Sequence, residues 1–229
     1  MSNTLYRISD STKVLLWVYG VGLAGMMIPY TRDLFILITP LNLLFAAAFL
    51  FYGTKPGIRV LLSGIFIAVS SFLIEAAGVA TGVIFGSYHY GSALGPKLLQ
   101  TPLIIGLNWF ILIYCTNIIS RQIWEGLRNR LRSSAGRLQE ITFTVLTASL
   151  LMVCYDLLLE PAAMRLDMWS WEGNGVPFNN YSSWFFISCG YHLIYRLWGE
   201  SGINRRALPL FVVQILFFAV IDLFFLLFY

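Results

Sequence analysis

The sequence has few charged residues. Only 11% of its 229 residues are Asp, Glu, Lys or Arg, 58% are apolar, and the mean hydropathy is +0.75. This composition excludes a water-soluble globular protein. A membrane helix takes about 20 residues, so about seven of them would use most of the chain and leave no room for a soluble domain. We therefore expect residues 1–229 to form a single integral membrane domain.

Residues that build disulfides, metal centres or nucleic-acid surfaces are also scarce. The three cysteines, Cys115, Cys154 and Cys189, are odd in number and lie inside apolar stretches, so we expect no disulfide framework. Two histidines without a set of neighbouring carboxylates make a metal centre improbable, and we expect none. The net charge of +4 comes from short loops rather than one basic face, which is not typical of nucleic-acid binding.

The scarcity of lysine excludes one class of seven-helix protein. A retinal-binding photoreceptor or pump needs a lysine in mid-helix to form its Schiff base. The only lysines are Lys13, Lys55 and Lys97, and all three lie outside the predicted helices or at the very start of one. The sequence therefore does not fit a retinal protein.

Apolar stretches predict an all-α, polytopic membrane helix bundle of about seven transmembrane helices. The first has no cleavage site behind it and is expected to be retained rather than removed as a signal peptide. The predicted helices cover residues 13–31, 34–52, 58–79, 101–120, 138–160, 180–198 and 207–228.

Residues 76–96 are uncharged but rich in glycine, so they could form an eighth span or a loop. With seven spans, 12 of the 15 Lys and Arg residues lie on the side of the N-terminus and 3 on the other. An eighth span would change this division to 6 and 9. The positive-inside rule favours seven spans with a cytoplasmic N-terminus, in the cytoplasmic (inner) membrane of a cell. Residues 76–96 then form an outer loop, either plain or re-entrant.

Three predicted helices contain a carboxylic acid where the bilayer disfavours charge. At about 1.5 Å per residue, Glu75, Asp156 and Asp222 each lie about 10 Å inside the outer end of their helix, and Asn108 lies at the same depth. A charge at the bilayer centre costs roughly 2.5–3.5 kcal/mol, so such residues usually face the bundle interior and mark a functional site. The alternative is an acid near a helix end that reaches water or pairs with a nearby basic residue.

Two polar clusters begin at these acids. The first runs from Glu75 to Lys97 and contains Tyr88, His89 and Tyr90 in succession, which places an imidazole between two phenols. A histidine in this position could equally belong to an aromatic belt at the membrane surface.

The second cluster runs from Asp156 to Trp171. Asp156 and Glu160 share a helix face at i and i+4, and we expect Pro161 to end the helix. Glu160 would then be a solvated residue at the helix end, paired with Arg165.

These clusters resemble the carotenoid biosynthesis protein family, which includes bisanhydrobacterioruberin hydratase and bacterial carotenoid 1',2'-hydratases. The resemblance also rests on the TPL sequence at 101–103, the DLLLEP sequence at 156–161 and the GVPFNN sequence at 175–180, and it spans about residues 70–185. It implies hydration of the terminal double bond of an acyclic (ψ) carotenoid end group. Haloarchaeal members act on C50 carotenoids and bacterial members on γ-carotene or lycopene; because this chain is basic, the resemblance favours a bacterial enzyme with a C40 substrate.

The residues suit this chemistry independently of the resemblance. Hydration of such an alkene needs a proton donor, a tolerated tertiary carbocation and one positioned water, but no cofactor. An apolar site can hold a carboxylic acid in its protonated form, and we expect this acid to be Asp156 or Glu75, with the other or His89 positioning the water. Asn108 and Asp222 are expected to orient this group. The remaining candidate substrate-binding residues are Tyr88, Tyr90, Trp109, Glu160, Trp169 and Trp171, whose aromatic rings could stabilise a cation or could simply face lipid.

The expected activity is thus that of a carotenoid 1,2-hydratase, a hydro-lyase that meets its lipophilic substrate among the membrane lipids. A carotenoid end-group cyclase or isomerase begins with the same protonation and differs in what captures the cation. A transporter that uses the carboxylates as proton relays and a carotenoid-binding scaffold are further alternatives. Association with other carotenoid enzymes is left open by the sequence.

Overall fold

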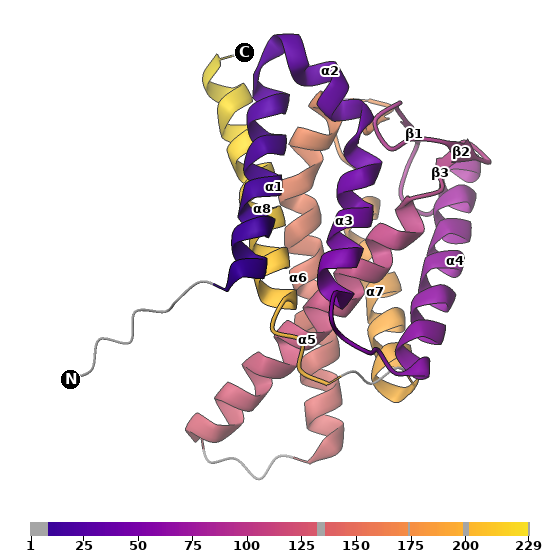
Figure 1. Ribbon diagram of the computed structural model, residues 1–229. Helices are drawn as coiled ribbons and strands as arrows, with labels where there is room; N and C mark the ends of the chain where they lie inside the picture. The colour runs from indigo at the N-terminus through magenta and orange to yellow at the C-terminus, as the bar shows by residue number, and fades with distance from the viewer. Residues whose placement is uncertain (1–8, 132–135, 174, 199–201, 229) are drawn as a thin grey trace.

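The computed structural model describes residues 9–131, 136–173, 175–198 and 202–228 (Figure 1). Two of the basic residues counted above, Arg7 and Arg132, lie outside the described residues. The helices are α1 (Asp10–Met27), α2 (Pro29–Leu37), α3 (Thr39–Phe51), α4 (Ile58–Thr81), α5 (Ile105–Leu131), α6 (Arg137–Arg165), α7 (Phe178–Trp198) and α8 (Ala207–Phe228). The strands are β1 (Tyr88–Tyr90), β2 (Lys97–Leu98), β3 (Thr101–Pro102) and β4 (Trp169–Trp171).

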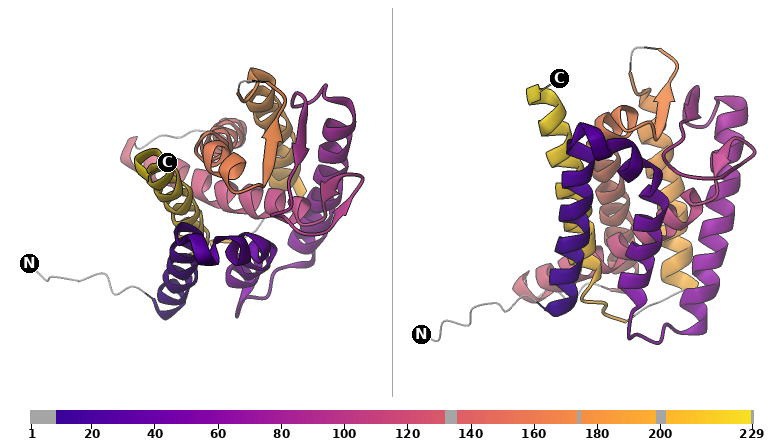
Figure 2. Two further views of the ribbon diagram at one scale, coloured as in Figure 1. Left: turned by 90° about the horizontal axis from the view of Figure 1, so that it is seen from above. Right: turned by 45° about the horizontal axis from the view of Figure 1, so that its top comes forward.

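Helix α5 forms the centre of the bundle. Every residue from Asn108 to Ser120 is buried, since α5 packs against α3, α4, α6, α7 and α8. The arginine-rich connection from α5 to α6 lies at one end of the bundle, and the strands lie at the other (Figures 1 and 2). The long helices alternate in direction between these ends, as the seven-span interpretation requires.

The prediction of one helix over residues 34–52 is wrong. This stretch belongs to two helices, α2 and α3, whose axes differ by 59°. Each begins with a proline in its first turn, Pro29 in α2 and Pro40 in α3. Proline fits the first turn of a helix but cannot donate the backbone hydrogen bond that a continuous helix would need at this point.

Membrane-spanning character is clearest in three helices. Within the described residues, α4, α6 and α8 are long and apolar enough to cross a bilayer, and the bent pair α2–α3 would make a fourth. Helix α4 also exposes a row of large apolar side chains suited to contact with lipid: Leu61, Leu62, Ile65, Phe66, Val69 and Leu73. The chain is therefore a helical membrane protein, with fewer clear spans than the seven expected.

Residues 76–96 do not form an eighth span. Helix α4 continues to Thr81 and ends at Gly82, whose φ of 65° is the left-handed conformation typical of a helix C-terminus. The chain then forms β1, which pairs with β4 in antiparallel register, with Tyr88 opposite Trp171, His89 opposite Ser170 and Tyr90 opposite Trp169. This two-stranded ribbon, residues 88–90 and 169–171, covers the end of the bundle where α4 and α6 end (Figure 2).

Asp167 fastens the loop after β1 to the turn before β4. Its carboxylate accepts hydrogen bonds from both the backbone N–H and the hydroxyl of Ser92, each at 2.7 Å. These bonds hold the pKa of Asp167 below its ordinary value. Asp167 also has a φ of 53°, a backbone conformation that asparagine tolerates equally well.

We expect Asp167→Asn to reduce the acid sensitivity of this loop. Because the folded-state pKa is lowered, the carboxylate stabilises the fold above its unfolded pKa of about 3.9, and this stabilisation is lost as the pH falls through the folded-state value. Thermal unfolding and hydrogen exchange at pH 6 and at about pH 3 would measure the loss. A variant that keeps the full acid sensitivity of the wild-type protein would contradict this role.

Candidate active site

The strand ribbon presents four aromatic side chains to the bundle. Successive residues of a strand point to opposite faces, so Tyr88 and Tyr90 are both buried while His89 between them is exposed. In β4, Trp169 and Trp171 face the same way as the two tyrosines, and Ser170 faces out. The inner face of the ribbon therefore carries two phenol O–H donors and two indole N–H donors.

Glu75 receives three hydrogen bonds at this face. Its side chain is only 4% exposed, and its Oε2 accepts the hydroxyls of Tyr88 at 2.5 Å and Tyr90 at 2.8 Å. The indole Nε1 of Trp109 in α5 donates to Oε1 at 2.8 Å. Burial and the neighbouring Glu75 raise the pKa of both tyrosines, which keeps the two phenols protonated as donors.

Glu160 is bound in the same manner by the other strand. Its Oε2 accepts the indole N–H groups of Trp169 and Trp171, each at 2.9 Å, and the side chain is 2% exposed. The expectation that Glu160 is a solvated partner of Arg165 is wrong. The helix does not end at Pro161 but runs on to Arg165, because burial of the next turn, including Ala162 and Ala163, outweighs the one backbone hydrogen bond that proline removes.

Asp156 completes a group of three carboxyl groups. It lies one helical turn before Glu160, and the side-chain amide of Asn180 in α7 donates to both, at 2.7 Å to Asp156 Oδ2 and 3.3 Å to Glu160 Oε1. Asp156 is 1% exposed, and its Oδ1 has no hydrogen-bond partner among the described residues. Asp156 is thus the least hydrogen-bonded of the three carboxyl groups.

Glu75, Asp156 and Glu160 line one small cavity of about 20 Å³. A cavity of this size holds about one water molecule. Asn108 also lines this cavity, as do Tyr88, Tyr90, Trp169 and Trp171. Trp109 does not line the cavity. It donates a hydrogen bond to Glu75, which does, and its ring stacks on Trp184 with the centroids 4.4 Å apart.

Two expected site residues lie outside this group. His89 is exposed, and its Nε2 lies 2.8 Å from the hydroxyl of Ser170 on the outer face of the ribbon; the alternation of the strand turns it away from Glu75. Asp222 is partly buried in α8 and lines neither this cavity nor the pocket beside it. Within the described residues, no group of three or more His, Cys, Asp or Glu residues could hold a metal ion.

Among the polar and aromatic residues that line the cavity, sequence reasoning missed Asn180, Trp184 and Phe85. Asn180 belongs to the GVPFNN sequence that carried the family resemblance, and this was the available signal for it. The other two have no such signal, because an aromatic residue among many others gives no indication of which neighbour it will face.

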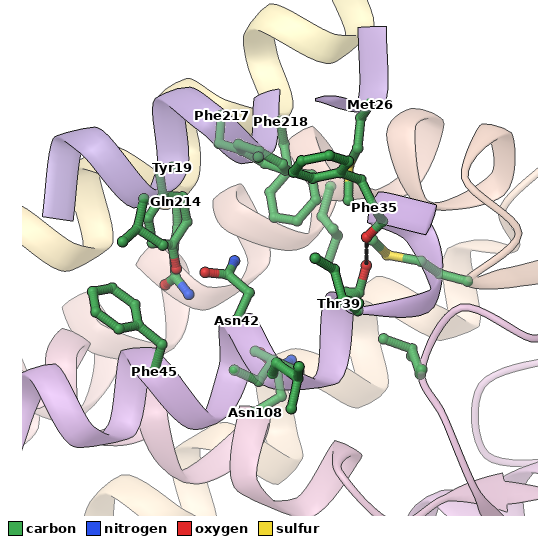
Figure 3. Close-up of a pocket in the computed structure, with 18 of the residues that line it drawn as sticks. Tyr19, Met26, Phe35, Thr39, Asn42, Phe45, Asn108, Gln214, Phe217 and Phe218 are labelled. Carbon is green, nitrogen blue, oxygen red and sulfur yellow. Dashed lines mark hydrogen bonds between the residues drawn. The ribbon is translucent and has the colours of Figure 1, made fainter. Parts of the chain in front are cut away.

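A larger apolar pocket of about 460 Å³ adjoins the carboxyl cavity. The two share four lining residues: Ile105, Asn108, Leu159 and Trp169. Most of the pocket lies between α1, α3 and α8, as Figure 3 shows. Its lining includes Trp17 and Leu41, which are 73% and 60% exposed on α1 and α3. The pocket therefore opens on an apolar part of the outer surface of the bundle.

The fold and the site define a helical membrane protein that buries a group of carboxyl groups beside an apolar pocket. The model of the family described as "Carotenoid biosynthesis protein" matches residues 35–229, and the chain belongs to this family. The resemblance seen in the sequence is thereby confirmed, over a longer stretch than the 70–185 expected.

A named relative comes from Haloarcula japonica. The chain is 29% identical over 185 residues to that organism's bisanhydrobacterioruberin hydratase. The match covers 73% of this chain and 60% of the relative, so the chain spans less than two thirds of the relative's length. No solved structure matches the chain.

Proposed function

We propose that the protein is a carotenoid hydratase that adds water to the terminal double bond of an acyclic (ψ) carotenoid end group. The observation that carries the proposal is the junction of two cavities. One is an apolar pocket of about 460 Å³, suited to a hydrocarbon chain, and the other is a polar cavity of about 20 Å³, suited to one water. The name of the relative, a hydratase, supports the same reaction.

The pocket opening supports entry of the substrate from the bilayer. A carotenoid is an apolar rod that dissolves in lipid, and Trp17 and Leu41 form an exposed apolar rim between α1 and α3. The end of the rod would pass this rim and reach Asn108 and Trp169 at the wall of the carboxyl cavity. Since the chain is basic, with a net charge of +4, we favour a bacterial enzyme acting on γ-carotene or lycopene.

Asp156 is the proton donor in this proposal. Hydrogen bonds from N–H and O–H donors favour the charged form of a carboxylate, and Glu75 and Glu160 each accept three such bonds. Asp156 accepts one, from Asn180. Because three neighbouring carboxyl groups cannot all be ionised at low cost, the proton belongs on the one with the fewest donors.

The reaction needs no proton donor or acceptor besides Asp156. Its proton forms a C–H bond with the less substituted alkene carbon, which leaves a tertiary carbocation and the Asp156 carboxylate. The water oxygen then bonds to the cationic carbon, and the surplus proton of that oxygen returns to Asp156. The Glu75 and Glu160 carboxylates, together with the rings of Tyr88 and Trp171, stabilise the cation electrostatically. His89 and Asp222 have no part in this mechanism.

The membrane orientation remains part of the proposal. We place the N-terminus in the cytoplasm and the protein in the cytoplasmic membrane as a multi-pass protein, because the short loops at the α5–α6 end carry most of the basic residues. The carboxyl cavity then lies toward the outer surface, beneath the strand ribbon.

Expression of the chain in a bacterium that accumulates lycopene or γ-carotene tests the function. Hydration would give a pigment heavier by one water, about 18 mass units, by chromatography and mass spectrometry. This experiment also distinguishes the alternatives. A pigment of unchanged mass with an altered spectrum would indicate a cyclase or isomerase instead, and unaltered pigment would contradict an activity on these substrates.

Asn180→Leu is expected to lower the rate of hydration by about 10- to 100-fold. The leucine keeps the volume of the side chain but removes the N–H groups that orient Asp156 and Glu160, and orienting groups of this kind contribute on this order. Purified protein in lipid vesicles would be assayed at several carotenoid concentrations. A fall in the maximal rate with unchanged half-saturation supports this positioning role, whereas a loss of folded protein would not.

A further inference from the structure

A polar group interrupts the apolar lining of the larger pocket. Tyr19 in α1, Asn42 in α3 and Gln214 in α8 all line it, and their polar ends point toward one another in Figure 3. Tyr19 and Gln214 are 5% and 3% exposed, and Asn42 is partly buried. Three separate helices thus bring one phenol and two carboxamides together in a pocket whose other residues are mostly apolar.

The hydrogen bonding of these three groups is incomplete for polar atoms that are so deeply buried. The two carboxamides lie close enough to the Tyr19 oxygen to donate to it. Within the described residues, however, the buried Tyr19 hydroxyl, Asn42 Oδ1 and Gln214 Oε1 form no hydrogen bond of good geometry. Buried polar atoms are nearly always paired, and each unpaired one is costly. The phenol proton and the two carboxamide oxygens, brought from three helices into one pocket, therefore indicate a ligand that supplies the missing partners.

The available atoms specify the chemistry of this ligand. A phenol can donate and accept, whereas each carboxamide offers an oxygen that accepts and an NH₂ group that donates. One hydroxyl oxygen matches this set, because it donates one hydrogen bond and accepts two. A cation is excluded by the lack of any carboxylate in the pocket lining, and an anion by the lack of any Lys or Arg there.

We infer that Tyr19, Asn42 and Gln214 form a second subsite that binds one hydroxyl group within the apolar pocket. The hydroxyl belongs either to an alcohol group of the bound hydrocarbon ligand or to a water molecule that moves toward the carboxyl cavity. Asn108, which lines both cavities, lies at the boundary between them. The inference rests on the proposed function only in assuming that an apolar chain occupies this pocket.

Three variants remove the polar atoms with little change of shape: Tyr19→Phe, Asn42→Leu and Gln214→Met. The matched control is Tyr30→Phe, because Tyr30 is fully exposed on α2 and lines neither cavity. A subsite for a ligand predicts that Gln214→Met melts at a higher temperature than the wild-type protein without ligand, since it removes an unpaired buried group. A structural role predicts a lower melting temperature.

Binding of two polyenes distinguishes the sources of the hydroxyl. The probes have the same conjugated chain, and only one has a tertiary alcohol on its end group; binding is followed by quenching of tryptophan fluorescence, since Trp17 lines the pocket. If the hydroxyl belongs to the bound polyene, the wild-type protein binds the alcohol probe about tenfold more tightly than the hydrocarbon probe, as one additional hydrogen bond allows. Each of the three variants then loses this preference, and Tyr30→Phe retains it.

If water supplies the hydroxyl, the wild-type protein binds both probes equally. The three variants then bind the hydrocarbon probe normally but hydrate it about tenfold more slowly. The inference is overturned if none of the variants changes either the preference or the rate, or if neither probe binds. If the wild-type protein prefers the alcohol probe but forms no hydrated product, the subsite is supported and the proposed hydratase function is rejected. Failure of the inference and failure of the proposed function therefore give different results.

Discussion

Asp156→Asn is expected to abolish carotenoid hydration, with a loss of about 10²- to 10⁴-fold, the usual contribution of a positioned general acid. Asparagine has the shape of aspartate but no acidic proton to give to the alkene. Its side-chain oxygen can still accept the hydrogen bond that Asn180 donates to Asp156 Oδ2 at 2.7 Å. The product would be measured in cells that accumulate the substrate and again with purified protein.

The fold should survive this substitution. Asp156 is buried one turn from Glu160 and carries the proton in the proposed mechanism, so asparagine replaces a neutral carboxyl group by a neutral amide and breaks no ion pair. We expect an unchanged or higher melting temperature. Asp33→Asn is the matched control, because Asp33 is exposed on α2 and should keep full activity. Normal product from Asp156→Asn would reject Asp156 as the acid and leave Glu75 as the candidate to test.

Gly106→Val is expected to prevent stable folding. A Cβ atom at Gly106 would lie 2.1 Å from the backbone oxygen of Ala68 and 2.8 Å from its carbonyl carbon. No rotamer change relieves this contact, since it is made by the backbone of α4. The two helices would have to move apart. They also hold Glu75, about two turns from Ala68, at hydrogen-bond distance from Trp109, about one turn from Gly106.

Gly106→Ala should already destabilise the protein by about 1–3 kcal/mol, the usual cost of overpacking a well-packed core, and valine should cost more. Gly126→Ala is the control within the same helix, because nothing lies within 4 Å of its added Cβ. That variant should gain about 0.4–1 kcal/mol. Thermal unfolding and gel filtration in detergent would measure both. Equal stability of the alanine variants at 106 and 126 would contradict the close approach of α4 and α5.

The charge division along the sequence predicted the two ends of the bundle. Lys97 in β2 and Arg165 at the end of α6 lie at the end that carries the strands, whereas the α5–α6 connection lies at the opposite end (Figure 1). The end at which each loop lies follows from the order of the helices along the chain once the apolar stretches are located. The sequence analysis did not predict the break between α2 and α3, because apolar composition alone does not indicate the bend next to Pro40.

Glu75 and Asp156 were recognisable as acids inside apolar helices, but their partners were not, and Asp222, predicted with them, lines neither cavity. Glu75 and Asp156 are conspicuous because a carboxyl group is expensive in an apolar helix. Their distinct environments depend on which strand covers which helix, and this follows from the pairing of β1 with β4. Glu160 could not be told from a solvated helix end, because Pro161 gives the same local signal whether or not the helix continues.

The amino-acid sequence was sufficient to identify a helical membrane protein of the carotenoid biosynthesis family and to show which acids interrupt its apolar helices. Hydropathy, charge asymmetry and helix rise are local or additive properties, and they can be read along the chain. Only the tertiary structure decided that His89 faces away while Tyr88 and Tyr90 face Glu75, and that an apolar pocket meets the carboxyl cavity. Those features depend on contacts between segments far apart in the chain, whose pairing no local pattern encodes.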